Sequence, residues 1–490
     1  MILEVPELEF YMPVKAIIFT ITCFLIIFVL ISKLAPFAVR SKEIIELLKG
    51  NRKPKEPPKA SIWLSIAGLL LIAAGYIIVV LKMAIPFDLG VIGILVSVGT
   101  YLFYSQLSVF TLIRLTSLPT LFFRRTNLLW ISDLVYRMKD NARLLFVVTI
   151  TCTVSFTTMA AFFSIYQSVD EEYAKSYPIP FNYFSYSSDV QRDNNLSIIS
   201  SELDEEGLSY RTVSVPFLEF DSDSSQKIGA ISTQGYNRLA ELLNREPLQL
   251  KSGEAIEVST WTNKADSRIT IQENETVHLG SDTLRLIGVV QDNIFPEGSF
   301  RNLCVLNDSD FEKQDSVLNK GVYYGYSVLD WTKASTAAEK IDAQIGTDWN
   351  GFKYRSSPDW YQTDQLTYKL ILFVGSFISI VFFIAAGSFI YFRFYTDVQE
   401  EKGKYRNLRK IGMTIREVKK IITVQLAILF FVPILLAALH SVFALQILQT
   451  RVSTSIGSYA STILIFFLVA WSIYFLLLRS RYLRSLLEET

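Results

Sequence analysis

Residues 144–167 read LLFVVTITCTVSFTTMAAFFSIYQ, an uncharged run of 24 residues that decides the fold. About 20 helical residues cross the roughly 30 Å hydrocarbon core of a bilayer, so this run is long enough to span it. Six further stretches of similar length carry almost no charge. The seven stretches are residues 14–32, 61–81, 89–112, 145–167, 370–392, 421–447 and 459–478. The sequence therefore predicts an α-helical polytopic membrane protein with seven transmembrane helices.

Charge is segregated between the loops, although the chain as a whole has 47 basic and 47 acidic residues. Residues 33–60 contain eight basic and three acidic side chains, and residues 393–420 contain nine and four. Short loops rich in Lys and Arg remain in the cytoplasm. Because consecutive spans alternate in direction, we expect a multi-pass protein of the cell membrane with its N-terminus outside and its C-terminus in the cytoplasm.

The long segment 168–366 is acidic, with 17 basic and 32 acidic residues, and we expect it to form an extracytoplasmic domain. It separates residues 1–167, which hold four transmembrane helices and basic cytoplasmic loops, from residues 367–490, which hold the last three helices. Its one cysteine, Cys304, has no partner within the segment. We therefore expect this domain to fold on its hydrophobic core without an internal disulfide.

This extracytoplasmic domain is predicted to be α+β. Runs rich in β-branched and aromatic residues indicate strands, and helical spacing of apolar residues indicates helices. The expected strands are Phe181–Tyr186, Arg211–Phe220, Ile256–Thr260, Arg268–Gln272, Leu284–Val290 and Val322–Val328. The expected helices are Leu196–Leu203, Tyr236–Asn244 and Ala334–Ile345.

Two segments on the cytoplasmic side are predicted to be ordered. In Arg124–Arg143 the apolar residues recur at helical spacing. In Tyr405–Lys420 apolar and basic residues alternate, and Gly412 followed by Thr414 indicates a break. Thr414 is a suitable N-cap for a helix that continues into the sixth span.

The motifs of common catalytic sites are absent from the sequence. There is no Gly-rich phosphate loop followed by Lys and Ser or Thr, and no kinase signature. Two histidines, His278 and His440, are too few for a histidine-rich zinc site. Carboxylate pairs such as those at 171–172 and 205–206 lie among other charges, as solvated faces do. We expect no catalytic residue, no metal, no cofactor and no nucleic-acid partner, so the chain is not predicted to be an enzyme.

The spans themselves argue against ion-coupled transport. A charged residue in mid-membrane is costly and is kept for function, but none of the seven spans has Asp, Glu, Lys or Arg at its centre. His440 lies near the outer end of its span and is expected to form a helix–helix hydrogen bond. The fourth span is rich in Ser and Thr, which favour close packing against a neighbouring helix. The energy for any transport must therefore come from a partner, unless the chain needs none.

Three blocks of sequence resemble one known family. From Tyr395 the chain reads YTDVQEEKGKYRNLRKIGMTIREVKKIITVQLAILFFVPILLAALHSVFALQIL. Thr126–Phe146 reads TNLLWISDLVYRMKDNARLLF, and Lys42–Gly50 precedes a Lys- and Pro-rich linker. In this order, around an external domain of about 200 residues, the blocks resemble FtsX-like ABC transporter permeases of the bacitracin-export type. Members of that family have ten spans, so the first three transmembrane helices are missing here. An internal start codon, a truncated gene or a functional short permease would each explain this.

The resemblance implies a permease subunit that works with a separate cytoplasmic ABC ATPase, expected to be dimeric. Such proteins resist and sense peptide antibiotics, such as bacitracin, that act on lipid-linked cell-wall precursors, and many pair with a membrane histidine kinase. The drug or lipid site would then lie within 168–366. ATPase contacts would lie in Asn127–Asn141 and Tyr405–Met413 or close by, and the candidates are Arg125, Arg137, Tyr405, Arg406, Arg409 and Lys410.

Two other functions remain open from the sequence. One is an energy-independent receptor whose external domain binds a ligand and signals to a kinase. The other is an FtsX-like permease that moves lipids or lipoproteins or controls a wall hydrolase. The cytoplasmic segments would serve such a lipid or hydrolase-controlling permease equally well, because the external domain determines the ligand.

Overall fold

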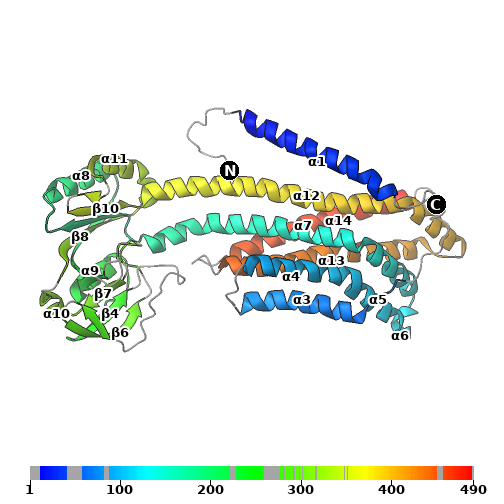
Figure 1. Ribbon diagram of the computed structural model, residues 1–490, viewed down its shortest axis with the longest axis horizontal. Coiled ribbons are helices and arrows are strands. Elements are labelled where there is room, and N and C mark those ends of the chain that lie inside the picture. Colours follow the sequence, from blue (N-terminus) through cyan, green and yellow to red (C-terminus); the bar gives the residue numbers. More distant parts are fainter. Residues whose placement is uncertain are drawn as a thin grey trace.

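The computed structural model describes residues 12–40, 58–81, 88–220, 228–258, 276–279, 282–290, 293–296, 298–300, 302–314, 317–346, 348–349, 351–449 and 456–487. Figure 1 shows an elongated molecule with a helix bundle and a β-sheet at one end of it. We call residues 177–357, which contain the sheet, the sheet domain. The opposite end of the bundle is called the distal end.

Seven helical segments of the described chain are long and apolar enough to cross a membrane, and each coincides with one of the predicted spans, which extend at most one residue beyond it. The third span is built from three pieces, because a π-helical turn, η2, joins α4 to α5. The helices are α1 (Val14–Arg40), α3 (Ile62–Val80), α4 (Asp88–Leu102), η2 (Phe103–Leu107), α5 (Ser108–Thr116), α7 (Asn127–Ser176), α12 (Pro358–Lys410), α13 (Ile415–Gln449) and α14 (Gly457–Leu487). The predicted helical membrane fold is confirmed.

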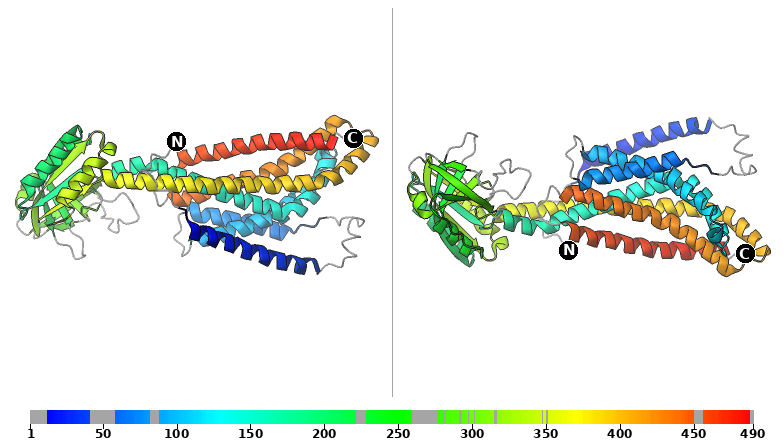
Figure 2. Two further views of the ribbon diagram at one scale, coloured as in Figure 1. Left: turned by 90° about the horizontal axis from the view of Figure 1, so that it is seen from above. Right: turned by 90° about the horizontal axis from the view of Figure 1, so that it is seen from below.

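Two of these helices are far longer than a bilayer requires. α7 has 50 residues and α12 has 53, which at 1.5 Å per residue correspond to about 75 and 80 Å. The predicted spans cover only the middle of each. Both helices run side by side from the sheet domain to the distal end (Figures 1 and 2). The predicted amphipathic segment Arg124–Arg143 therefore forms one continuous helix with the fourth span from Asn127 onward.

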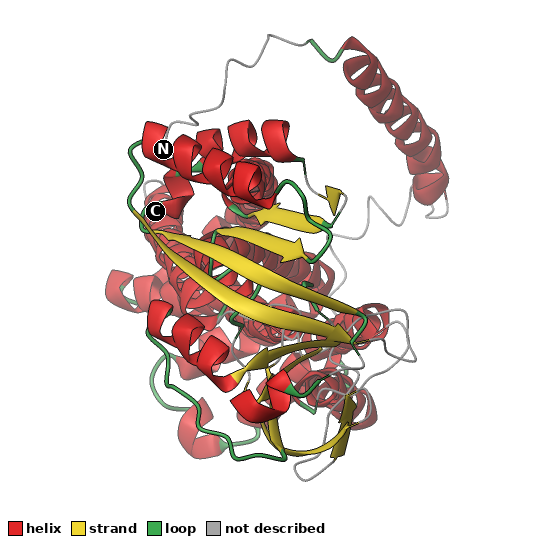
Figure 3. Cartoon of the chain, turned by 90° about the vertical axis from the view of Figure 1, so that its left-hand side faces the viewer, coloured by secondary structure: helices red, strands yellow, loops and turns green. Residues whose placement is uncertain are grey.

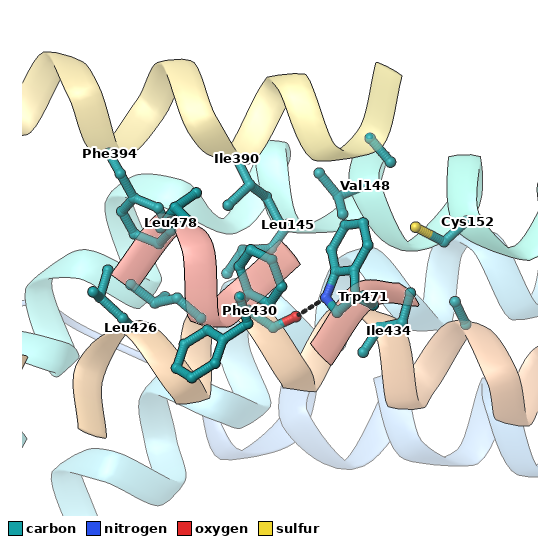
Figure 4. Packing of buried hydrophobic residues seen from close by; sticks show 14 of the residues in the cluster. Leu145, Val148, Cys152, Ile390, Phe394, Leu426, Phe430, Ile434, Trp471 and Leu478 are labelled. Atoms are coloured by element: carbon teal, nitrogen blue, oxygen red, sulfur yellow. Dashed lines mark hydrogen bonds between the residues drawn. The ribbon is translucent and has the colours of Figure 1, made fainter. Parts of the chain in front are cut away.

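The core of the bundle forms where α7 contacts α12, α13 and α14. Trp471 of α14 is fully buried, and its indole nitrogen donates a hydrogen bond to the Phe430 carbonyl of α13 at 3.0 Å (Figure 4). Ser155 of α7 and Ser379 of α12 each donate to the other's carbonyl oxygen, both at 2.7 Å. This reciprocal pair lets the two backbones approach closely, as the hydroxyl-rich fourth span predicts.

His440 joins three transmembrane helices through its two ring nitrogens. The Tyr76 hydroxyl of α3 lies 2.5 Å from Nδ1, and the Thr100 hydroxyl of α4 lies 2.9 Å from Nε2. Phe443, one turn further along α13, stacks on the Tyr76 ring with centroids 3.7 Å apart. The expected helix–helix hydrogen bond is confirmed, and it attaches the α3–α4 hairpin to α13.

Helix α1 is separate from the rest of the bundle. Figure 3 shows it apart from the other helices. None of its apolar window is buried against the protein. Its apolar side chains are therefore in position to face lipid or another membrane helix.

The sheet has ten strands in the order β5-β6-β4-β7-β3-β2-β8-β1-β10-β9 among the described residues. The pairs β3–β7 and β4–β6 are parallel, and the others are antiparallel. The strands are β1 (Phe181–Tyr186), β2 (Tyr210–Phe220), β3 (Ile228–Ser232), β4 (Glu254–Val258), β5 (Thr276–Leu279), β6 (Asp282–Val290), β7 (Asn302–Leu306), β8 (Asn319–Val328), β9 (Asp348–Trp349) and β10 (Phe352–Ser356).

The centre of the sheet is buried on both faces, which explains the aromatic content of β1. Successive side chains of a strand point to opposite faces. Tyr183 packs with the helices α8 (Arg192–Glu205) and α11 (Ser335–Ile345) on one face. Phe184 packs on the other with Phe217, Phe300 and the helix α9 (Thr233–Leu242). The short helices α10 (Asp308–Glu312) and η3 (Trp331–Lys333) complete the domain.

The α+β prediction for this segment is confirmed. Four of the expected strands correspond to β1, β2, β6 and β8, and the three expected helices correspond to α8, α9 and α11. The strand expected at Ile256–Thr260 is β4, which begins at Glu254, and the strand expected at Arg268–Gln272 lies outside the described residues. β3, β5, β7, β9 and β10 were not predicted from the sequence.

Candidate functional site

Two chain reversals form the distal end of the bundle. The first is the connection from α5 to α7, which contains the short helix α6 (Pro119–Phe122) and Arg125 in a left-handed conformation with φ +51°. The second is the turn from α12 to α13, where Gly412 has φ +107°. A side chain with Cβ rarely adopts that angle, so glycine permits the reversal.

The start of α13 is capped as predicted. The backbone N–H of Glu417 donates to the Thr414 hydroxyl at 3.3 Å, and the Thr414 N–H donates to the Glu417 carboxylate at 2.9 Å. This reciprocal arrangement is a capping box. The break expected at Gly412 and Thr414 is therefore confirmed, and the turn has a defined shape.

The surface of the distal end combines positive charge with apolar side chains. Arg125, Arg406 and Lys410 are exposed, and Arg409 is half-buried. Ile411 at the α12–α13 turn is 83% exposed, and Phe123 beside α6 is 67% exposed. The distal end thus exposes two large apolar side chains as well as basic ones.

Beneath this surface, four charged side chains join α7 to α12. The Arg137 guanidinium of α7 contacts Asp133 at 2.7 Å and Glu401 of α12 at 2.5 Å. Lys404 of α12 contacts Asp133, and its ammonium lies 3.9 Å from Glu401. The side chains of Arg137 and Glu401 are only 11% and 10% exposed. Two positive and two negative groups thus form a neutral, largely buried cluster, which we call the α7–α12 ion cluster.

The α7–α12 ion cluster extends to α13 through neutral side chains. Gln425 donates from its side-chain amide to Asp133 at 2.9 Å and accepts a hydrogen bond from the Tyr405 hydroxyl at 3.4 Å. Burial raises the pKa of Glu401, and the neighbouring Arg137 and Lys404 oppose that rise. The carboxylate depends on its cationic partners because it has lost most of its contact with water.

The structure divides the six candidate residues into two groups. Arg137 and Tyr405 lie inside the bundle, where they bind side chains of α7, α12 and α13. Arg125, Arg406, Arg409 and Lys410 lie at the surface of the distal end. Reasoning from the sequence missed the partners Asp133, Glu401 and Lys404. The four-residue spacing of Asp133 and Arg137 would have indicated a pair on one helix face, but it does not reveal Glu401.

A second polar junction joins α7 and α12 where they meet the sheet domain. The Tyr173 hydroxyl of α7 donates to Asp364 of α12 at 2.6 Å, and the Tyr361 hydroxyl of α12 donates to Asp170 of α7 at 2.7 Å. The ring of Trp331 in the sheet domain contacts the Tyr361 ring, with centroids 4.7 Å apart. The two long helices are thus joined near both ends. The sheet domain contacts this second junction directly, through Trp331.

The side chains at these junctions suit mechanical linkage better than chemistry. Among the described residues, no group of three or more His, Cys, Asp or Glu side chains is placed to hold a metal ion. The acidic groups of the α7–α12 ion cluster are bound by cations. The arrangement can hold helices in register and pass a movement along them.

Residues 376–484 match the family model of the FtsX-like permease C-terminal domain. The chain is 32% identical over 494 residues to the ABC transporter permease protein YxdM of Bacillus subtilis, covering 99% of this chain and 78% of that protein. It is 20% identical over 469 residues to the bacitracin export permease protein BceB of the same organism, covering 88% and 70%. The corresponding protein of Halalkalibacterium halodurans is 23% identical, covering 90% and 72%. The chain belongs to the FtsX-like ABC transporter permeases, which are multi-pass membrane proteins.

Proposed function

We propose that this permease is the membrane subunit of an ATP-driven system that senses and resists peptide antibiotics acting on lipid-linked cell-wall precursors. The distal end faces the cytoplasm, and the sheet domain lies outside the cell. A cytoplasmic ATPase, with which permeases of this family work, supplies the energy and docks at the distal end. The sheet domain handles the drug or the lipid-linked target.

The observation that carries this proposal is the continuity of α7 and α12. Each helix extends from the distal end to the sheet domain, and polar junctions tie the pair at both ends. A displacement at the distal end is therefore transmitted over about 75 Å without crossing a flexible loop. The basic loops support the topology, since Arg406, Arg409 and Lys410 belong to the segment that the positive-inside rule places in the cytoplasm.

The proposed ATPase-docking surface consists of Arg125, Arg406, Arg409 and Lys410 with the exposed apolar residues Phe123 and Ile411. Charges at the rim of an interface steer association and select the partner, whereas buried apolar groups hold it. Arg137 and Tyr405 do not contact the ATPase. They support the docking surface, because they keep α7, α12 and α13 in register beneath it.

The antibiotic role is supported by the relatives named for bacitracin export and by the acidic sheet domain, which suits a cationic peptide. It is tested in cells that express the permease with its ATPase. Resistance should disappear when the catalytic carboxylate of the ATPase is replaced, while both proteins remain in the membrane. Undiminished resistance would contradict the ATP-driven function and favour a receptor.

Docking is tested separately by copurification of the ATPase with the permease. The triple reversal Arg406→Glu, Arg409→Glu and Lys410→Glu should reduce the recovered ATPase at least tenfold, because like charges across an interface cost several kcal/mol. A matched reversal on α13, Arg416→Glu with Lys420→Glu, changes exposed side chains near the same end and should have a smaller effect. Equal recovery with the triple variant would show that the ATPase docks elsewhere.

A further inference from the structure

One edge of strand β2 is open over the first half of the strand. β2 pairs with β8 from Tyr210 to Glu219, but it pairs with β3 only from Phe217 onward. Among the residues that the structure describes, no strand pairs with this second edge of β2 from Tyr210 to Pro216. An unpaired strand edge presents a row of N–H and C=O groups to which another extended chain can bind.

The register of β2 and β8 shows which backbone groups point to this edge. Just before β2, the Ser209 carbonyl oxygen accepts a hydrogen bond from the Leu329 N–H at 3.1 Å. In an antiparallel pair, every second residue of a strand bonds to the same neighbour. The odd-numbered residues of β2 therefore bond to β8, and the N–H and C=O groups of Thr212 and Ser214 point to the open edge. The guanidinium of Arg238 in α9 lies at that edge, 3.5 Å from the Ser214 carbonyl oxygen.

A groove of about 530 Å³ lies along the open edge, between β2 and α9. Its volume is within the range of ligand sites. The Arg211 guanidinium of β2 donates a hydrogen bond to the Leu242 carbonyl oxygen at the end of α9 at 3.0 Å. This bond fixes α9 beside the strand, so the groove has a defined shape. The described lining residues are Arg211, Thr212, Val213, Ser214, Arg238, Glu241 and Leu242.

The groove is more positive than the domain that contains it. Of the charged residues among those described in its lining, Arg211 and Arg238 are basic and Glu241 is acidic. The segment 168–366 as a whole has 17 basic and 32 acidic residues. Both arginines are exposed, and a guanidinium has five N–H donors. Arg211 can therefore keep its bond to Leu242 and still bind a carboxylate.

We propose that the open edge of β2 binds an extended, acidic segment of another protein, which adds a strand to the sheet. The N–H and C=O groups of Thr212 and Ser214 bond to the backbone of that segment, as they do when a peptide extends a sheet. Arg211 and Arg238 bind carboxylates of its side chains. Pro216 has no N–H to donate, so the added strand ends there. On the proposed topology the partner lies outside the cell, and the inference does not depend on the antibiotic role.

The test is the binding of a dye-labelled hexapeptide, TVEVET, to the full-length permease in detergent, measured by fluorescence anisotropy. The two glutamates of this peptide point to one face of an extended chain. The parent protein should bind TVEVET at least about tenfold more tightly than TVKVKT, because like charges across an interface repel. Methylation of all backbone nitrogens of TVEVET removes the donors for strand pairing and should abolish binding.

Two variants test the strand edge and its charges separately. Arg238→Glu should weaken the binding of TVEVET by about tenfold or more and strengthen that of TVKVKT. Ser214→Pro removes an N–H that points to the open edge, where proline is tolerated, and should weaken the binding of both peptides. The matched control is Lys251→Glu, which reverses an exposed charge of the sheet domain outside the groove. It should bind both peptides as the parent does.

Equal binding of TVEVET by Arg238→Glu and the control would overturn the proposal. Absence of binding to the parent would also overturn it, by showing that the arginines only protect the edge from pairing. A dimer of the parent that Ser214→Pro dissociates would assign the edge to a second copy of this chain instead. These measurements need neither ATPase nor antibiotic. Copurification of the ATPase with the same variants, which should be unchanged, separates a failure of this surface from a failure of the proposed function.

Discussion

Replacement of Arg137 by Met tests whether the α7–α12 ion cluster holds the two long helices together. Arg137 contacts Asp133 at 2.7 Å and Glu401 at 2.5 Å, and its side chain is 11% exposed. Removing one member of a buried ion pair costs roughly 3–5 kcal/mol, because the remaining charge stays buried. Lys404 still contacts both carboxylates, so we expect a loss of roughly 2–3 kcal/mol in the free energy of unfolding.

The sign of the charge imbalance supplies a sharper test. The parent cluster is neutral, and Arg137→Met leaves two carboxylates with one ammonium. Adding Glu401→Gln restores neutrality, so the double variant should be more stable than Arg137→Met by roughly 1 kcal/mol or more. Unfolding in mild detergent, followed by tryptophan fluorescence, measures both changes. Arg406→Met, which alters an exposed position of the same helix, should stay within about 0.5 kcal/mol of the parent. A double variant less stable than Arg137→Met would refute this reasoning.

Four further substitutions test other positions. Gly375→Ala places a Cβ in steric conflict with the Phe162 ring and should destabilise the fold by roughly 1–3 kcal/mol. Gly403→Ala on the same helix meets nothing within 4 Å and should stabilise it by roughly 0.5–1 kcal/mol. Thermal unfolding distinguishes the two variants. His440→Phe removes two interhelical hydrogen bonds and should cost roughly 1–2 kcal/mol while leaving the pH profile of resistance unchanged; a shifted profile would indicate a proton relay. Burial raises the pKa of Glu257 from 4.5 to about 7 in the folded protein. Between these pH values the unfolded chain has lost the proton that the folded protein keeps, so the free energy of unfolding should fall as the pH rises. Glu257→Gln should flatten this fall, and an unchanged slope would refute the assignment.

The transmembrane helices could be predicted because hydrocarbon imposes a strong and local constraint on sequence. No predicted span extends more than one residue beyond its helical segment. The lengths of α7 and α12 could not be predicted in the same way, because hydrophobicity marks only the part of each helix inside the membrane. Beyond the membrane these helices are stabilised by contacts between distant residues, such as Tyr173 with Asp364. Those pairs leave no periodic signal in either segment.

The candidate residues illustrate the same limit. Basic composition drew attention to the ends of α7 and α12, but it cannot distinguish Arg137, which is buried in an ion pair, from Arg406, which is exposed. The distinction depends on the face of the helix that meets a neighbour. For α12 that face is set by its packing against α7 and α14. In the sheet domain, short strands such as β3 and β7 were missed because they pair over more than 70 positions of sequence.

The central claim is that this permease is moved by a partner and supplies no chemical energy itself. The most direct measurement is ATP hydrolysis in proteoliposomes that contain the purified permease alone, with its ATPase, or with its ATPase and the Arg406→Glu, Arg409→Glu, Lys410→Glu variant. We expect no ATP hydrolysis by the permease alone and ATP hydrolysis by the permease with its ATPase. With the variant, the rate of hydrolysis should no longer depend on the permease. Hydrolysis of ATP, or uphill movement of a solute, by the permease alone would contradict the claim.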